Sequence, residues 1–218
     1  MADGPQAVVA IVASLGLGYL CGALPWGLWL GRWVRGVDVR TLGSRNLGAT
    51  NVYRTLGPAL GVATLLLDIG KGALATALLP DQAFARHFPG GREWCMVAVA
   101  VAAVSGHVWT CFAGFRGGKG VATTVGVLLA MAPASFAVFV AVFVATVALT
   151  RYVSLGSVLG AVAFAVALGL AAGGGVRSPT FMVGVLLAVL VIVRHRENLV
   201  RLLRGTERRF SLRGGRDA

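Results

Sequence analysis

The chain has 218 residues, of which 57% are hydrophobic and 13% charged, and its mean hydropathy is +0.81. This composition excludes an ordinary soluble globular domain and indicates a protein that spans a membrane. The formal net charge of +12 does not indicate a nucleic-acid partner, because the arginines cluster directly beside apolar runs, as they do in membrane proteins.

Seven apolar segments follow one another along the chain, at residues 7–31, 57–79, 94–112, 121–131, 134–149, 153–173 and 180–193. A helix rises ~1.5 Å per residue and the hydrocarbon core is ~30 Å thick, so most of them are long enough to cross it. The fourth is short, which leaves two arrangements open: about seven transmembrane helices, or five plus a short hairpin. The sequence predicts an all-α polytopic integral membrane protein with a single domain, 1–218.

Charge placement predicts the orientation of these segments. Most cations stand in the loops and termini at 32–56, 113–120, Arg151 and 194–218. Because cytoplasmic loops are rich in Lys and Arg, we expect the N-terminus outside and the C-terminus in the cytoplasm. A straight helix over 121–149 would put the basic tail outside, and we reject it. Residues 207–218 are predicted to form a flexible basic tail.

The stretch 42–57, "LGSRNLGATNVYRTLG", is polar and punctuated by glycine. If a helix begins near Thr50, Asn51 and Arg54 share one of its faces. An arginine can hold a phosphate through two parallel hydrogen bonds. The alternative is a capping loop before the second span, which explains the Asn and Ser residues but not the arginine, and both interpretations stay open.

The stretch 114–124, "GFRGGKGVATT", combines glycines with two cations, Arg116 and Lys119. Glycines let backbone amides turn toward a ligand, and a helix N-terminus adds positive potential, so the stretch favours a phosphate-binding loop. It is not a Walker A loop, because three residues separate Gly114 from Gly118 and a glycine follows the lysine. The alternative is a cytoplasmic turn whose cations only set the topology.

The stretch 194–207, "RHRENLVRLLRGTE", predicts a helix with His195 and Asn198 on one side. Histidine suits proton transfer near neutral pH, although the neighbouring arginines are equally typical of an anionic-lipid surface. Asp68 and Lys71 lie inside the second span, where a mutual ion pair is expected. The sequence has no cluster with metal-ligand spacing and no covalent nucleophile motif, so we expect neither a metal nor a cofactor.

These three stretches resemble the signature motifs of the acyl-phosphate:glycerol-3-phosphate acyltransferases, the PlsY family. "GSRNLGATNVYR" is similar to the first motif, "GHVWTCFAGFRGGKGVAT" to the second and "RHRENLVRLLRGTE" to the third. "DIGKG" and "TRYVSLGS" also look like family segments. The departures are Arg45 for the usual glycine, Thr110 for the usual proline and Arg116 for the usual lysine.

The resemblance implies transfer of a fatty acyl group from acyl-phosphate to the 1-hydroxyl of sn-glycerol 3-phosphate, giving lysophosphatidic acid and phosphate without a cofactor. It also implies contact with membrane lipids, a bacterial plasma membrane and an active site on its cytoplasmic face; the oligomeric state stays open. The implied catalytic residues are Ser44, Lys119, His195 and Asn198. The implied substrate- and phosphate-binding residues are Asn46, Asn51, Arg54, Arg116, Gly117, Gly118, Gly120 and Ser154. Either His195 or the acyl-phosphate itself accepts the hydroxyl proton, and Glu207 is expected to support the structure.

Two other functions stay in view. A transporter of a phosphorylated solute fits the charged pair Asp68 and Lys71 inside a span. Against it, the sequence has no inverted repeat, and its polar stretches gather on one predicted side of the membrane. A non-catalytic membrane scaffold is the third interpretation.

Overall fold

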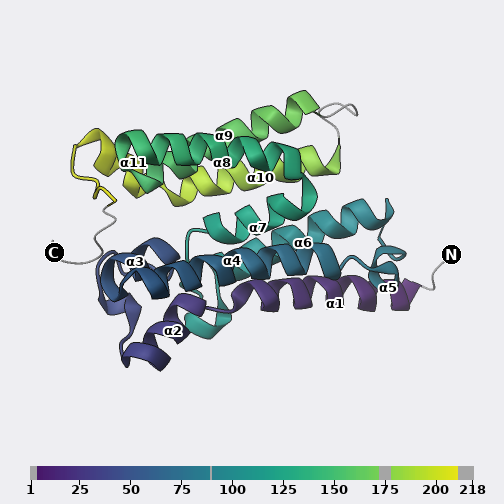
Figure 1. The fold of residues 1–218 in the computed structure, drawn as a ribbon. Coiled ribbons are helices and arrows are strands. Elements are labelled where there is room, and N and C mark those ends of the chain that lie inside the picture. Colours follow the sequence, from purple (N-terminus) through teal and green to yellow (C-terminus); the bar gives the residue numbers. More distant parts are fainter. Residues whose placement is uncertain (1–3, 89, 172–177, 211–218) are drawn as a thin grey trace.

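In the computed structural model, the chain is described over residues 4–88, 90–171 and 178–210, and these residues form only helices and their connections. The helices make two layers with one short helix between them (Figure 1). In chain order they are α1 (Gly4–Ala23), α2 (Trp26–Arg35), η1 (Val39–Thr41), α3 (Ala49–Leu56), α4 (Pro58–Leu78), α5 (Gln82–Ala85), α6 (Gly91–Val108), η2 (Cys111–Ala113), α7 (Val121–Met131), α8 (Pro133–Thr150), α9 (Val153–Ala171), α10 (Pro179–Arg194) and α11 (Arg196–Leu203).

Five helical segments of the described chain are long and apolar enough to cross a membrane. They are α1, α4, α8, α9 and the stretch Gly91–Ala113, which includes α6. The helices α10 and α11 qualify as a sixth when taken together, although the chain bends by 54° between them. With 11 residues, α7 rises only ~16 Å and does not cross alone. The predicted sixth segment, 153–173, extends two residues beyond the described part of α9.

The first predicted span, 7–31, is wrong in its second half. The helix α1 ends at Ala23, and the separate, amphipathic α2 begins at Trp26. Pro25 explains the break, because proline has no amide hydrogen to donate and disfavours helical geometry in the residue before it. The chain therefore leaves the direction of α1 before the membrane helix would have reached residue 31.

The rejection of a straight helix over 121–149 is confirmed. The helix α7 ends before Ala132, whose backbone is not helical, and Pro133 begins α8. Figure 1 shows α8 running back in the opposite direction to α7. The start of α1 and the helix α11 consequently lie at opposite ends of the bundle (Figure 1).

Close backbone contact fixes the short helix α7 against α4. A Cβ atom added to Gly126 would lie 1.9 Å from the Ile69 carbonyl oxygen, and one added to Gly72 would lie 2.2 Å from that of Thr123. Only glycine permits such an approach. As a result, the loop before α7 has a fixed position relative to the first layer of the bundle.

Candidate active site

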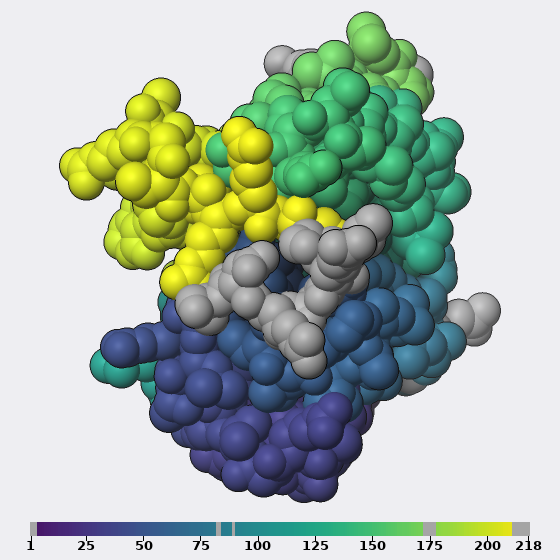
Figure 2. Space-filling model, turned by 60° about the vertical axis from the view of Figure 1, so that its left-hand side comes forward, coloured from purple at the N-terminus to yellow at the C-terminus, as the bar shows by residue number. Residues whose placement is uncertain are grey.

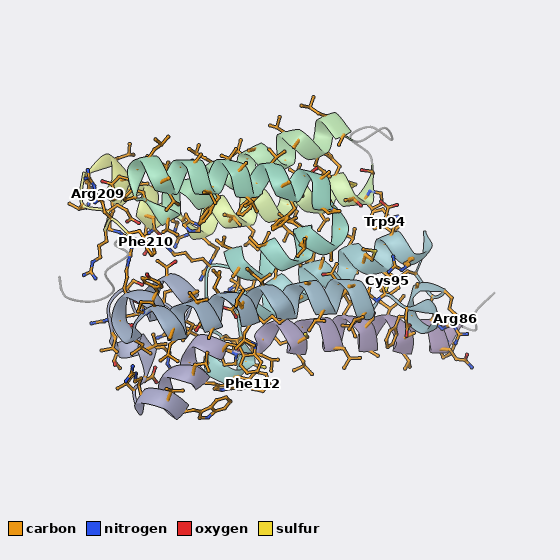
Figure 3. The ribbon with its side chains drawn as sticks, in the orientation of Figure 1. Arg86, Trp94, Cys95, Phe112, Arg209 and Phe210 are labelled. Atoms are coloured by element: carbon orange, nitrogen blue, oxygen red, sulfur yellow. The ribbon has the colours of Figure 1, made fainter. Side chains whose placement is uncertain are left out.

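Polar stretches that are far apart in the sequence gather at one end of the bundle, which we call the loop end (Figure 1). They comprise residues 36–57, 109–120, 151–152 and 195–210. In Figure 3, Arg209 and Phe210 lie at this end, whereas Arg86 and Trp94 lie at the other. The fold thus brings the three predicted motifs together on one side.

The glycine loop before α7 is held by backbone hydrogen bonds. The Gly117 amide donates to the Val108 carbonyl at 3.0 Å, and the Gly118 amide donates to the His107 carbonyl at 3.1 Å. A Cβ on Gly118 would lie 2.0 Å from His107 Nε2, so no larger residue fits there without displacement. Gly120, with φ of +86°, precedes the first turn of α7, where unpaired amides favour an anion.

Arg194 connects the glycine loop to the third motif. Its guanidinium donates a hydrogen bond to the Gly118 carbonyl oxygen at 3.1 Å. From the sequence, we considered this arginine only as a lipid contact. In the structure, Arg194 also has a structural role. As the last residue of α10, it connects that helix to the loop that carries Lys119.

Lys119 and Asn198, predicted as catalytic, are in contact. The Lys119 ammonium donates a hydrogen bond to Asn198 Oδ1, and the Asn198 side chain is buried at the start of α11. Burial lowers the pKa of Lys119 to about 8, while the negative charge of Glu207 opposes the shift. Below that pH the site therefore holds a partly desolvated positive charge, which attracts phosphate strongly.

Glu207 is the centre of this cluster; we expected it to support the structure, but the sequence did not reveal its partners. Its Oε1 accepts hydrogen bonds from Asn198 Nδ2 at 2.6 Å and Ser154 Oγ at 2.7 Å, and its Oε2 accepts one from Arg201 Nε at 2.8 Å. Burial would raise the pKa of Glu207, but these hydrogen bonds outweigh it and hold the pKa below its ordinary value. Because Glu207 fixes the Asn198 amide group, the Asn198 oxygen faces Lys119. Ser154 in turn supports Glu207 with its hydroxyl.

His195 lies at the bend between α10 and α11 and is 97% buried, with an exposed fraction of 3%. Its Nδ1 lies 2.8 Å from the Val191 carbonyl oxygen. A carbonyl only accepts hydrogen bonds, so Nδ1 carries the proton and Nε2 is the nitrogen with a lone pair. The ring is therefore oriented by its own helix.

The first motif forms a loop organised by Asn51. The Asn51 side chain accepts a hydrogen bond from the Ser44 amide at 2.8 Å and donates to the carbonyls of Leu42 and Asn46. Asn46 Oδ1 accepts from the Gly48 amide at 2.8 Å. These contacts assign Asn46 and Asn51 to the loop itself, while Ser44 is exposed on its surface.

Arg45 stands where the resemblance expects glycine, and its backbone explains that preference. Its φ is +58°, in the left-handed region. Glycine adopts this region freely, whereas a residue with a side chain is disfavoured there by roughly 1–2 kcal/mol. Thr110, which replaces the expected proline, donates its hydroxyl to the Ala23 carbonyl at the end of α1. A proline has no side-chain donor to make that contact.

Arg54 links the first motif to the end of the described chain. Its guanidinium donates to the Arg208 carbonyl oxygen at 3.1 Å, and burial lowers its pKa. Arg116 is exposed in the glycine loop. Among the described residues, no hydrogen bond joins Ser44, Arg54 or Arg116 to Lys119, so the loops bring these groups to one end without direct contact.

Residues 207–210, at the start of the predicted tail 207–218, make specific contacts with both layers. The Phe210 amide donates to the Arg151 carbonyl at 2.6 Å, and the Phe210 ring lies 5.0 Å from that of Tyr53. In Figure 2 this yellow segment reaches from the green second layer to the blue first layer. The contacts of Glu207 and Phe210 explain why the segment is held. Residues 211–218 lie outside the described part of the chain.

A charged cluster lies buried beneath the glycine loop. Lys71 Nζ lies 2.8 Å from Asp68 Oδ1 and donates to the Leu24 carbonyl at 2.7 Å, which confirms the expected ion pair. His107 Nδ1 lies 3.7 Å from the same carboxylate oxygen. The cluster lines a small cavity together with residues of the first and second motifs, including Leu47, Thr110 and Gly118. The charged cluster therefore lies between the helix break that follows α1 and the loops of the first two motifs.

Within the described ranges, no group of three or more His, Cys, Asp or Glu residues is placed to hold a metal ion. The groups that the described part of the site offers to a ligand include cations, backbone amides and the buried imidazole of His195. This chemistry is suited to holding phosphate groups and positioning them for a reaction.

Comparison with known proteins gives a consistent result. The profile of a family described as glycerol-3-phosphate acyltransferase matches residues 12–205. A glycerol-3-phosphate acyltransferase of Anaeromyxobacter sp. (strain Fw109-5) is 42% identical over 213 residues, which cover 96% of this chain and 99% of the relative. One from Geobacter metallireducens is 48% identical over 192 residues, which cover 88% and 93% of the two chains.

Solved structures are similar over almost the whole chain. The crystal structure of PlsY (YgiH), an integral membrane glycerol 3-phosphate acyltransferase, in its glycerol 3-phosphate form has a TM-score of 0.78 and 34% sequence identity. The match covers 94% of this chain and 96% of that one. The lysophosphatidic acid form has a TM-score of 0.78 and 33% identity, with 93% and 96% covered.

Proposed function

The chain belongs to the glycerol-3-phosphate acyltransferase family, and from this premise we propose that it transfers a fatty acyl group from acyl-phosphate to the 1-hydroxyl of sn-glycerol 3-phosphate. The products are lysophosphatidic acid and inorganic phosphate. The observation that carries the proposal is the half-buried Lys119, which contacts Asn198 beside a glycine loop at a helix N-terminus. A partly desolvated cation among backbone amides is suited to a phosphate-bearing substrate.

In the proposed reaction, the substrate hydroxyl oxygen bonds to the acyl carbonyl carbon, and the bond from that carbon to the phosphate oxygen breaks. The hydroxyl proton passes to His195 Nε2 or to the leaving phosphate. Because both substrates are anionic, cations must bring them together against their repulsion. Lys119, Arg54 and Arg116 supply that charge, and Ser44 and the loop amides stabilise the developing oxyanion.

The remaining predicted residues support these groups in the proposal. Gly117, Gly118 and Gly120 offer backbone at the loop, and Asn198 orients Lys119. The hydrogen bonds of Asn46, Asn51 and Ser154 are made within the protein, so we assign their effect on substrate binding to the loops that they hold.

We place the protein in the bacterial inner membrane with its loop end in the cytoplasm. The basic stretches at residues 32–56, 113–120 and 194–210 all lie at that end. An excess of Lys and Arg is typical of the cytoplasmic side. Glycerol 3-phosphate, a water-soluble metabolite, would then reach the site directly.

The test is turnover by the purified full-length protein in detergent or lipid, with palmitoyl-phosphate and glycerol 3-phosphate. Phosphate release and lysophosphatidic acid are followed, and palmitoyl-CoA serves as the comparison donor. Lys119→Ala is expected to abolish product, whereas Arg204→Ala, at an exposed position of the chain after α11, is expected to retain it. No product from well-folded protein with either donor would overturn the proposal and favour transport assays.

A further inference from the structure

Two neighbouring hydroxyls beside the glycine loop, those of Thr123 and Thr124, are buried without a hydrogen-bond partner, and Thr124 also lines a pocket. Thr124 Oγ1, in the first turns of α7, makes no hydrogen bond, and the residue is only 5% exposed. Thr124 lines a pocket between α7, α8, α9 and α10 whose other walls are entirely apolar. They are formed by Val121, Leu128, Phe139, Ala161, Phe164, Gly184, Leu187, Ala188 and Val191. A buried donor without an acceptor is unfavourable, and its position in the wall of a pocket points to a ligand.

The pocket begins beside the candidate active site. The Thr124 amide donates to the Gly120 carbonyl at 2.8 Å, which places Thr124 one helical turn beyond the glycine loop. The pocket is also lined by Val191 of α10, whose carbonyl oxygen lies 2.8 Å from His195 Nδ1. The pocket therefore lies between α7, which follows Lys119, and α10, which precedes His195, and it extends from these residues into the apolar interior.

This arrangement matches one part of an acyl-phosphate. The ligand of such a pocket must be apolar along most of its length and must carry one acceptor close to its anionic head. In acyl-phosphate, the carbonyl group is attached to the phosphate through a single bridging oxygen. When the phosphate is bound at the glycine loop, the carbonyl oxygen of the acyl group lies about one helical turn, ~5 Å, inside the pocket.

We infer that Thr124 contacts the donor substrate directly, donating a hydrogen bond from its hydroxyl to the acyl carbonyl oxygen while the chain lies in this pocket. The inference rests on the proposed function and deepens it. The hydrogen bond polarises the carbonyl that is attacked, and it strengthens as negative charge develops on the oxygen. The pocket has about 10 Å³ of open space, so a chain that enters moves the Leu and Val side chains of its walls.

The neighbouring Thr123 is a matched control. Its hydroxyl is also buried and without a partner, but its side chain faces α4. A Cβ on Gly72 would lie 3.1 Å from Thr123 Cγ2, and Thr123 does not line the pocket. The two threonines thus share chemistry, helix and burial, and differ in the side of α7 on which they lie.

The experiment uses direct binding of two unreactive probes to the full-length protein. The first is a 2-oxoalkylphosphonate, in which CH2 replaces the bridging oxygen of acyl-phosphate and the carbonyl is kept. The second is the alkylphosphonate of equal chain length, which lacks the carbonyl. The Kd of each probe is measured for wild type, Thr124→Val, Thr124→Ser and Thr123→Val, and turnover of palmitoyl-phosphate is measured in parallel.

Thr124→Val is expected to weaken binding of the 2-oxoalkylphosphonate about tenfold and to leave the alkylphosphonate unchanged. Thr124→Ser keeps the hydroxyl and should preserve the difference between the probes, and Thr123→Val should behave as wild type. Equal effects on both probes, or no effect, would overturn the inference, as would an equal loss in Thr123→Val. If Thr124→Val does not fold, Thr124→Ala replaces it.

The parallel turnover separates this inference from the proposed function. If the wild-type protein turns over palmitoyl-phosphate but Thr124→Val binds the two probes with the same Kd values as the wild type, only the Thr124 inference is overturned. Absence of wild-type turnover would sink the proposed function, and the inference that rests on it would fall with it.

Discussion

The ion pair between Asp68 and Lys71 offers a quantitative test of the fold at the loop end. The two side chains are 2% and 3% exposed, and their charged atoms lie 2.8 Å apart. Lys71→Met leaves the Asp68 carboxylate buried without its lysine, and the His107 ring is 3.7 Å away. Stranding a buried charge costs roughly 3–5 kcal/mol. At roughly 2–4 °C per kcal/mol for a chain of this size, the expected fall in Tm is roughly 6–20 °C.

The double variant Asp68→Asn/Lys71→Met sharpens the test because it removes both charges. Neutralising a whole buried pair is far less destabilising than removing one member, so the double variant should recover most of the lost Tm. An exposed pair provides the matched control. Arg32 and Asp38 lie 2.9 Å apart, with Arg32 51% exposed, and Arg32→Met should change stability by about 0.5 kcal/mol or less.

The assay follows the exposure of Cys95 in detergent with a dye that becomes fluorescent on reaction with thiols. Cys95 is completely buried, so it reacts only when the protein unfolds. Cys111 is exposed and Cys21 is half-buried, so both are replaced by serine in every variant. A Lys71→Met variant as stable as Arg32→Met would refute the reasoning, and so would a double variant no more stable than the single one.

Three further predictions concern the site. Because burial lowers the pKa of Lys119 to about 8, its ammonium is present below that pH and lost above it. The KM for glycerol 3-phosphate should therefore rise above pH 8 by up to about tenfold per pH unit, whereas Lys119→Arg should stay flat; identical profiles would contradict this assignment. Glu207→Gln removes the charged acceptor shared by three donors and turns an amide group toward Arg201, so kcat/KM should fall by roughly 10- to 150-fold with the protein still folded; full activity would mean that the charge does not hold the cluster. Arg45→Gly should raise the unfolding temperature or leave it unchanged, since φ of +58° suits glycine, and a clear fall in a thermal scan would show that the Arg45 side chain makes a stabilising contact.

Much of the fold followed from hydropathy alone. Long apolar runs without charge specify helices, and the Pro133 break was visible as a turn between two runs. The end of α1 was missed because residues 24–31 remain apolar, so composition did not reveal that Pro25 stops the helix. The amphipathic pattern of α2 becomes evident only when residue 26 is taken as its start.

The site was less accessible to sequence reasoning. The motifs located Lys119 and Asn198 but not their contact, since residues 79 positions apart meet only through packing. Glu207 looked like the end of a motif before a basic tail, although its bonding partners lie on two separate helices. No local pattern marks Thr124, whose missing partner is a property of the pocket.

The short helix α7 has a consequence for where the chemistry takes place. Its ~16 Å rise is about half the thickness of the hydrocarbon core, and Figure 1 shows it beginning well inside the bundle. The glycine loop is thereby sunk below the ends of α4 and α8. Lifting an acyl chain of about 15 methylenes into water would cost about 12 kcal/mol, at ~0.8 kcal/mol for each CH2. In the proposed reaction, glycerol 3-phosphate instead enters the site at the level of the bilayer. The fatty chain then stays in the hydrocarbon core throughout its transfer.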